Sequence, residues 1–314
     1  MGLPEARLDL SAIPRVLAAT AMLAVWTTTA SAQVFPVGPG PYEPAVPTVA
    51  AIRGEPTGAA FTTTSDVVRI LERIAATSPR VLLERYGTTA EGRPLVLAWI
   101  STPENLARLD ALRTANSAVL GSGSAHNAQV DPPLFVWLAF GVHGDEPAGP
   151  EAALELVYHL AASRDRATTR WLERVVVVVD PLQNPDGHDR YLDDYRSRSG
   201  PVPDPDPEAP EHRPPWPGGR TNGLLFDLNR DWAWGIMPET RARWKVYLET
   251  LPQVMVDFHE MDAGSTYFFF PPAEPIHPLL PASTLAWAER FGEANASVFR
   301  SRGWAYYTRR DFDL

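Results

Sequence analysis

The 314-residue sequence contains no cysteine. This absence excludes disulfide bonds, thiolate metal sites and a cysteine nucleophile. Positive charge is also scarce, because 28 lysines and arginines stand against 38 aspartates and glutamates, which leaves a net charge of −10. Nucleic-acid-binding proteins carry basic surfaces, so the composition argues against a nucleic-acid partner. A metal ion, if one is bound, must be held by histidine and carboxylate side chains.

Apolar runs long enough to cross a bilayer, about 20 residues, are missing as well. The run Val16–Trp26 is eleven residues long, follows Arg15 and precedes Ala30-Ser31-Ala32. This order of a basic residue, an apolar run and small residues is typical of an export signal. We therefore expect residues 1–32 to be a signal peptide, the protein to be secreted or periplasmic, and the mature chain to have no integral membrane segment.

Proline, in contrast, is abundant, with 32 residues that concentrate in two segments. Residues 33–63 are rich in proline and show little periodicity, so we expect an extended leader that crosses the surface outside the core. Residues 201–217 include eight prolines. Because proline disrupts both helices and sheets, we expect an extended surface loop there. The remaining chain, residues 64–314, is interpreted as one domain that includes this loop.

Strand-like and helix-like patterns alternate along that domain. Helices are predicted from Ser65 onward and over residues 104–120, 150–162, 239–250 and 283–302. Strands are predicted at Val81–Tyr86, Leu95–Ile100, Leu134–Phe140, Arg174–Asp180 and Val254–Phe258. The first two strands are spaced as a hairpin, and Arg174–Asp180 has the continuous apolar character of a strand covered on both faces. The pattern predicts an α/β fold with a mixed central sheet, parallel core strands and helices on both faces.

Unusual polar residues follow three of these strands. His143 and Glu146 come after Leu134–Phe140, the Asn184–Gly187 segment comes after Asp180, and His259 follows Val254–Phe258. Ligands of open α/β sheets bind at the carboxyl ends of the strands. We therefore expect the three groups to face one crevice, and we interpret Asn184–Gly187 as a tight turn that shapes it.

Two histidines and one glutamate in this placement suggest a metal site. A His-x-x-Glu pair alone is weak support, because a single histidine is more often a hydrogen-bonded structural residue. His143, Glu146 and His259 together, however, form the two-imidazole, one-carboxylate set of catalytic zinc sites, which leaves a position for water or substrate. A zinc ion there lowers the pKa of its water and polarises a carbonyl oxygen. The sequence thus predicts one zinc ion.

The order of four motifs resembles the zinc carboxypeptidases of the carboxypeptidase A type. The motifs are His143-Gly144-Asp145-Glu146, Asn184-Pro185-Asp186-Gly187, Asp227-Leu228-Asn229-Arg230-Asp231-Trp232 and Asp257-Phe258-His259. Upstream, Tyr86-Gly87 and Glu91-Gly92-Arg93-Pro94-Leu95 are similar to the hairpin that begins such domains. The resemblance extends from about Ser65 to the last residue.

This resemblance implies a role for each matching residue. His143, Glu146 and His259 are the implied zinc ligands, Asn229 and Arg230 hold the terminal carboxylate of the substrate, and Asp227 orients a zinc-bound histidine. The implied substrate is a peptide or protein with a free C-terminus. The chemistry of these side chains agrees, because the planar fork of arginine matches a carboxylate and metal-bound imidazoles need a partner on the other ring nitrogen.

The family also uses an arginine that polarises the scissile carbonyl. The candidates between the second and third motifs are Arg190, Arg196, Arg198, Arg213 and Arg220. We choose Arg220, because Gly218-Gly219 allows a close approach of the backbone and because Arg220 lies near Asp227 in the sequence.

The general-base glutamate of the family has no evident counterpart. Its position lies in a strand well downstream of the last zinc histidine, and the glutamates after His259 are Glu260, Glu274, Glu289 and Glu293. None has a suitable context. We therefore expect the base to lie beyond Leu314 and the fold to be incomplete at the C-terminus.

Three hypotheses follow from this reading of the C-terminal end. The first is a fragment of an exported zinc carboxypeptidase, which a glutamate-bearing strand encoded after Leu314 would favour. The second is a non-catalytic binder of zinc and carboxylates, which gains support if the natural protein ends at Leu314. The third is a zinc-dependent deacylase of small N-acyl amino acids.

Overall fold

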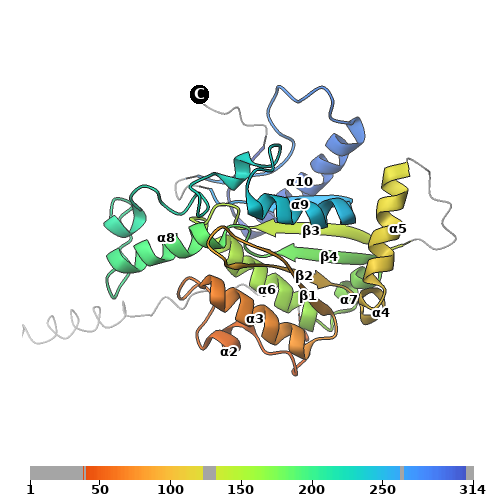
Figure 1. Cartoon of the computed structure of the whole chain (residues 1–314), viewed down its shortest axis with the longest axis horizontal. Helices are drawn as coiled ribbons and strands as arrows, with labels where there is room; N and C mark the ends of the chain where they lie inside the picture. Colours follow the sequence, from red (N-terminus) through yellow and green to blue (C-terminus); the bar gives the residue numbers. More distant parts are fainter. Residues whose placement is uncertain (1–37, 39, 123–131, 262–264, 309–314) are drawn as a thin grey trace, which may run out of the picture. The chain divides into compact units, whose positions relative to one another are not determined.

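The computed structural model describes residues 38, 40–122, 132–261 and 265–308 (Figure 1). The predicted export signal, residues 1–32, lies outside the described residues. Contacts within the chain define a larger compact unit that ends at Val256 and a smaller one that begins at Asp257. The single domain predicted for residues 64–314 is therefore described as two parts.

The last residue of the sequence, Leu314, also lies outside the described residues, which end at Thr308. The expectation that the general base lies beyond Leu314 is not tested by the structure. It stays a prediction, and so does the choice between a fragment and a chain that naturally ends at Leu314.

The predicted hairpin begins the sheet. Strand β1 (Val81–Thr88) pairs antiparallel with β2 (Pro94–Ile100). Gly92 in the connection has a φ of +84°, a left-handed conformation that glycine adopts without strain. Gly87 is required for a different reason, because a Cβ at this position would lie 2.6 Å from the Cβ of Ala242. The close approach lets the strand pack directly against the helix that carries Ala242.

The middle of the sheet confirms the predicted mixture of strand directions. Strand β4 (Val175–Asp180) lies between β2, to which it is antiparallel, and β3 (Leu134–Phe140), to which it is parallel. The complete order is β1-β2-β4-β3-β5, with β5 at Val254–Phe258. The continuous valine run of β4 reflects this central position, because both faces of a central strand are covered.

Helices cover both faces of the sheet, as predicted. Alternate residues of a strand point to opposite faces, so Val177 and Val179 join one apolar cluster while Val176 and Val178 join the other. The first cluster includes side chains of α3 (Thr64–Thr77) and α6 (Ala148–Ala162). The second includes side chains of α5 (Leu109–Ser122) and α9 (Pro238–Thr250). Figure 1 shows α3 and α6 on one side of the strands and α9 on the other.

The predicted helix over residues 104–120 is divided into α4 (Pro103–Leu106) and α5. Thr102 caps α4 by accepting a hydrogen bond from the N–H of Asn105. The buried amide of Asn105 then donates to the carbonyls of Leu172 and Glu173. These bonds attach the first turn to a neighbouring element, where the sequence pattern indicated one continuous helix.

Within the predicted domain, residues 64–314, two described helices have no counterpart among the predicted elements. One is α7 (Arg166–Arg174), which is mostly polar and is capped by Asp165. The other is α8 (Pro185–Arg198), with Asn184 as its N-cap and Pro185 in its first turn. The interpretation of Asn184–Gly187 as a tight turn was therefore wrong. Asparagine at the N-cap followed by proline is a helix-start signal, and that signal explains the difference.

The expected leader outside the core is also incorrect for residues 42–53. Val46 and Val49 are buried in the first apolar cluster, and residues Val49–Arg53 form helix α2. Arg53 forms an ion pair with Glu151 of α6 at 2.7 Å. Proline restricts backbone hydrogen bonding but does not prevent neighbouring valines from packing, so a proline-rich segment still contributes to the core.

The second proline-rich segment, residues 201–217, lies on the surface as predicted. Val202 and Trp216 are strongly exposed, and the only regular structure in this described segment is a 3₁₀ turn at Pro210–His212. The side chain of Glu211 in this turn is buried and accepts a hydrogen bond from the N–H of Asp204 at 2.8 Å. The loop therefore has an internal order that its extended prolines alone do not predict.

The smaller unit contains the predicted C-terminal helix, α10 (Ala282–Arg302). Its short strands β6 (Tyr267–Phe268) and β7 (Tyr306–Tyr307) are parallel. Phe299 of the helix packs edge-on against Phe269, with ring centroids 4.8 Å apart. Among the helices that the structure describes, none has the length and apolarity needed to cross a membrane.

The burial of Val49 gives a direct test of the corrected N-terminal boundary. Val49→Ala removes two buried methyl groups and should lower the free energy of unfolding by about 2 kcal/mol. Val202→Ala, at an exposed valine, is the matched control and should leave stability unchanged. Urea unfolding followed by circular dichroism measures both. Equal unfolding midpoints for the two variants would show that α2 does not belong to the core.

Candidate active site

The turn after β3 carries His143 and Glu146. His143 is buried, and its Nδ1 lies 2.6 Å from Oε1 of Glu146. Gly144, between them, is packed so closely that a Cβ there would collide with the main chain of Gly187 and His188. Its N–H donates to the carbonyl of Gly219 at 3.0 Å. The tight turn thus places both side chains at the carboxyl end of β3.

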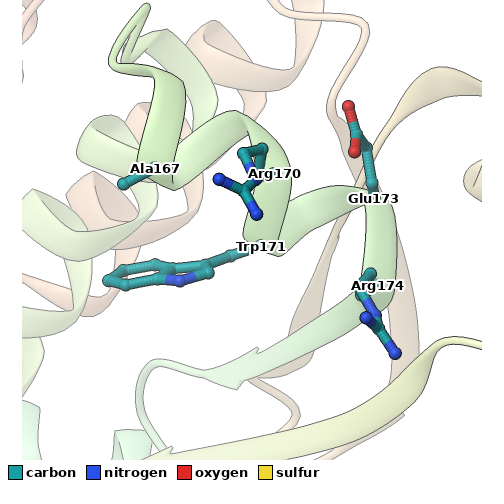
Figure 2. Close-up of a pocket in the computed structure, with 5 residues that line it drawn as sticks. All are labelled: Ala167, Arg170, Trp171, Glu173 and Arg174. Carbon is teal, nitrogen blue, oxygen red and sulfur yellow. The ribbon is translucent and has the colours of Figure 1, made fainter.

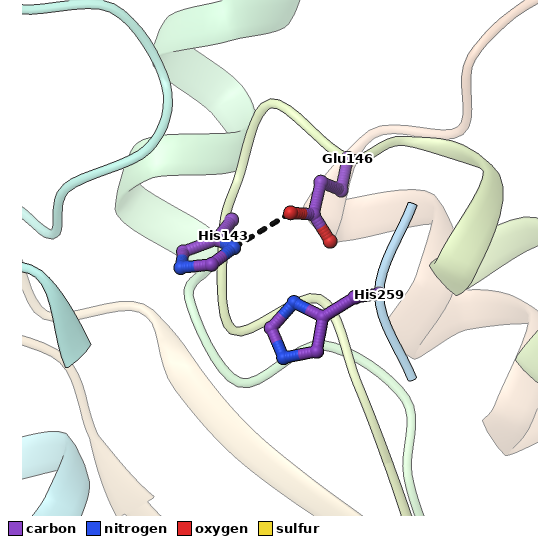
Figure 3. A group of neighbouring side chains, drawn as sticks. All are labelled: His143, Glu146 and His259. Atoms are coloured by element: carbon purple, nitrogen blue, oxygen red, sulfur yellow. Dashed lines mark hydrogen bonds and ion pairs between the residues drawn. The ribbon is translucent and has the colours of Figure 1, made fainter. Parts of the chain in front are cut away.

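His259 directly follows β5, the sheet neighbour of β3. One ligand atom from each of His143, Glu146 and His259 lies within 4.8 Å of the others, and Figure 3 shows the three side chains converging. Two imidazoles and one carboxylate form a donor set that suits zinc and leaves a coordination position open. The chemistry of these side chains therefore fits the predicted ion, and the group could hold a metal.

Asp227 connects several residues of this site. Its Oδ1 lies 3.4 Å from Nε2 of His143, on the ring nitrogen opposite the one that faces Glu146. Its Oδ2 accepts a hydrogen bond from Nε of Arg220 at 3.0 Å. A carboxylate hydrogen-bonded to the second nitrogen fixes the orientation of a metal-bound imidazole. The resemblance implies this role for Asp227, and the role stays a prediction.

Asp257 is in a similar position with respect to the other histidine, and the sequence analysis did not identify it. Its Oδ2 lies 3.0 Å from Nε2 of His259. The Asp-x-His spacing on a strand end was the available signal, because residues i and i+2 of a strand point to the same face. Each of the two candidate histidine ligands thus has an aspartate at its Nε2.

The five candidate arginines differ clearly in their contacts. Arg196 and Arg198 pair with aspartates of their own helix, and Arg213 pairs with Glu208. The guanidinium of Arg190 donates to main-chain carbonyls of residues 218–222. Nη1 of Arg220 lies 3.4 Å from Nδ1 of His143. Arg220 thus lies next to a candidate metal ligand, and its contact with the scissile carbonyl stays a prediction.

Asn229 and Arg230 lie in a 3₁₀ turn, Leu228–Arg230, that Asp227 caps. The N–H of Asn229 donates to Oδ1 of Asp227 at 2.9 Å. Arg230 is exposed, and its Nη1 donates to the carbonyl of Asn229 at 3.1 Å. The two residues that were predicted to hold a carboxylate are therefore attached to the same aspartate as His143, with one guanidinium accessible to solvent.

Asp186 of the Asn184–Gly187 segment takes part in a network of ion pairs around Arg93. Asp186 is buried and accepts hydrogen bonds from Thr89 Oγ1 and Arg93 Nη1, both at 2.7 Å. Arg93 also donates to Asp189 at 2.9 Å. Partial burial lowers the pKa of Arg93, but hydrogen bonds to Glu91, Asp186 and Asp189 outweigh it and raise the pKa above the ordinary value. This network attaches the β1–β2 hairpin to the start of α8.

Asp145 lies between the two candidate ligands of the β3 turn. Burial raises the pKa of its carboxyl above the ordinary value, while a hydrogen bond from its own N–H and the nearby His143 oppose the shift. No role was predicted for this residue.

A surface depression of about 400 Å³ lies elsewhere, on α7 (Figure 2). Its lining residues are Ala167, Arg170, Trp171, Glu173 and Arg174. They include none of the predicted site residues, and exposed Trp171 lies below Arg170 in Figure 2.

More than half of the chain matches a known protein family. Residues 67–250 match the model of the family described as zinc carboxypeptidase. The chain belongs to this family. The matched range includes the first three motifs, and the Asp257–His259 motif follows it.

A relative agrees with that assignment in sequence, and two solved structures have a similar fold. Carboxypeptidase 2 of Trichophyton rubrum is 32% identical over 151 residues, which cover 46% of this chain and 22% of the relative. Carboxypeptidase A of Helicoverpa armigera has a similar fold, with a TM-score of 0.52, 16% identity, and coverage of 79% of this chain and 57% of that chain. A metallo-carboxypeptidase from Burkholderia cenocepacia has a TM-score of 0.50 and 18% identity, and the match covers 79% of this chain and 53% of that chain. The chain thus spans about half the length of these solved structures and less of the fungal relative.

The donor set leads to a binding prediction. The purified chain should bind close to one equivalent of zinc, and His143→Ala should reduce this to background because it removes one of three ligands. The exposed His277 provides the matched control, and His277→Ala should retain the metal. Metal content after dialysis, measured by mass spectrometry, tests this. Full zinc occupancy in His143→Ala would contradict the ligand assignment.

Proposed function

We propose that this chain provides the metal centre and the carboxylate-binding site of a zinc carboxypeptidase that releases residues from the C-termini of peptides. The observation that carries the proposal is the convergence of His143, Glu146 and His259, whose ligand atoms lie within 4.8 Å of one another. Family membership supports the same reaction class.

The three converging side chains would hold one zinc ion. When bound, zinc supplies a water of lowered pKa and polarises the scissile carbonyl. Asp227 and Asp257 would keep the two imidazoles in a fixed tautomer and orientation, since each carboxylate contacts an Nε2. With the proton on each Nε2, Nδ1 of each ring would be the atom that holds the ion.

The free carboxylate of the substrate would bind to Arg230 and Asn229. The exposed guanidinium of Arg230 offers two parallel donors, and the Asn229 amide adds a neutral donor next to it. Both residues are fixed by the turn that Asp227 caps. This recognition would restrict cleavage to the end of a chain, because an internal peptide bond has no carboxylate at that distance.

Arg220 would contact the oxygen of the scissile carbonyl. Its guanidinium lies near His143, and Asp227 holds it through Nε, which leaves its terminal nitrogens directed toward the metal-site residues. A positive donor at this place stabilises the negative charge that develops on the oxygen in the transition state.

The general base is not one of the four glutamates after His259. Glu289 and Glu293 lie on helix α10, and Glu293 pairs with Arg300. Glu274 accepts a hydrogen bond from the N–H of Ile276 at 3.1 Å. Glu260 directly follows a proposed zinc ligand. These four glutamates therefore take no part in proton transfer, and the described residues carry out the binding steps. Residues 1–32 would direct export of the protein.

Carboxylate recognition is tested with Arg230→Ala. This variant should weaken binding of peptides with a free C-terminus by about 2 to 3 kcal/mol, the contribution of hydrogen bonds to a charged group. Binding of the C-terminally amidated peptide should not change, because its end carries no charge. Isothermal titration of zinc-loaded protein measures both, and Arg170→Ala, at an exposed arginine of α7, is the control. Equal losses for both peptides would contradict the role of Arg230.

The absence of a base among these glutamates is tested by turnover. The zinc-loaded 314-residue chain should bind peptides without hydrolysing them faster than His143→Ala does, as measured by release of the C-terminal amino acid. Hydrolysis that disappears in Glu260→Gln would identify Glu260 as the base. Failure to bind any free C-terminal peptide would instead favour a zinc-dependent deacylase of smaller N-acyl substrates.

A further inference from the structure

The main chain of residues 218–222, which carries Arg220, is held at five successive carbonyl groups. Each carbonyl accepts a hydrogen bond from a residue outside this stretch, and the donors come from two motif regions. The bonds run from Arg190 Nε to Gly218 (2.6 Å), Gly144 N to Gly219 (3.0 Å), Asn184 Nδ2 to Arg220 (3.1 Å), Arg190 Nη2 to Thr221 (2.5 Å) and Arg190 Nη1 to Asn222 (3.3 Å).

Arg190 supplies three of these five bonds from one side chain. It extends from α8 and is half-buried, and its Nη2 also reaches Oγ1 of Thr221 at 3.2 Å. The planar guanidinium carries donors on both sides of its fork, so it can bridge carbonyls on either side of residue 220. A lysine has one nitrogen and cannot occupy these separate positions.

Hydrogen bonds have a large role here because apolar packing is scarce in this stretch. The sequence Gly-Gly-Arg-Thr-Asn has no large apolar side chain, and Gly218 has a φ of +61°. The side chain of Arg220 is itself 45% exposed. A long, partly solvated side chain is positioned mainly by its own main chain and by the bond from its Nε to Asp227.

We propose that Arg190 is a positioning residue that fixes the main chain of residues 218–222 and thereby places the Arg220 guanidinium beside the metal-site residues. The inference rests on the proposed function, because it gives Arg220 a task in which its position matters. Displacement of a reacting group by about 1 Å can reduce an enzyme's rate by about 100-fold.

The test uses two peptide probes that differ at one group. One is a free C-terminal peptide, and the other is its phosphinic analogue, whose tetrahedral oxygens resemble the charge of the transition state. Arg220→Ala should lower affinity for the phosphinic peptide by about 100-fold. Arg190→Ala should lower it by about 10-fold. Affinity for the ordinary peptide should stay within about two-fold in both, because ground-state binding depends on Arg230.

The control and the conservative variant separate positioning from general destabilisation. Arg196→Ala, an exposed arginine of the same helix, should leave both affinities unchanged. Arg190→Lys should give an intermediate phosphinic affinity, since it restores part of the carbonyl contacts. If Arg190→Ala does not fold, as judged by its thermal unfolding curve, Arg190→Lys provides the decisive measurement.

The double variant examines whether Arg190 acts through Arg220. In the Arg220→Ala background, removal of Arg190 should reduce phosphinic affinity by less than about two-fold, because coupled residues are not additive. A full further loss of about 10-fold would show an independent effect and overturn the inference. The inference would also be overturned if the unmodified protein binds both peptides and Arg190→Ala has the same ratio of phosphinic to ordinary peptide affinity as the unmodified protein. If the unmodified zinc-loaded chain binds neither peptide, the proposed function itself fails.

Discussion

Parallel pairing of β3 with β4 is the constraint on which the rest of the site depends. Parallel strands end at the same edge of a sheet, so the β3 turn with His143 and the start of α8 after β4 must lie next to each other. The close packing of Gly144 against Gly187 and His188 follows from this proximity. A side chain at Gly144 would separate the two segments and change the direction of His143.

A second level of order is made of polar contacts between segments that are distant in sequence. Asp227 contacts His143, Arg220 and Asn229, so one carboxylate connects a candidate metal ligand with the residues proposed to contact the scissile carbonyl and the substrate carboxylate. Partly buried charges are stabilised when their hydrogen-bonding capacity is used, and Asp227 accepts bonds at both oxygens. A loop without apolar side chains can be well ordered in this way, as the bonds from Arg190 illustrate.

The strongly periodic elements were predictable because local apolar patterns determine them. The β4 valine run and the α3 repeat are examples, and both appear where the sequence placed them. Helix α7 was missed because it is mostly polar, and α8 because its start was interpreted as a turn. Burial of Val49 was missed because neighbouring prolines masked a short apolar segment. In each case a tertiary contact or a capping residue outweighed the average composition.

By itself the sequence determined the types of the candidate metal ligands, their order along the chain and the exclusion of thiolate chemistry, because these properties belong to individual side chains. The tertiary structure alone decided that Asp257 lies at Nε2 of His259 and that Arg190 donates to the carbonyls of Gly218, Thr221 and Asn222. The physical reason is that these contacts join side chains to distant backbone groups. Their distances depend on strand pairing and on the path of a proline-rich loop, neither of which local periodicity specifies.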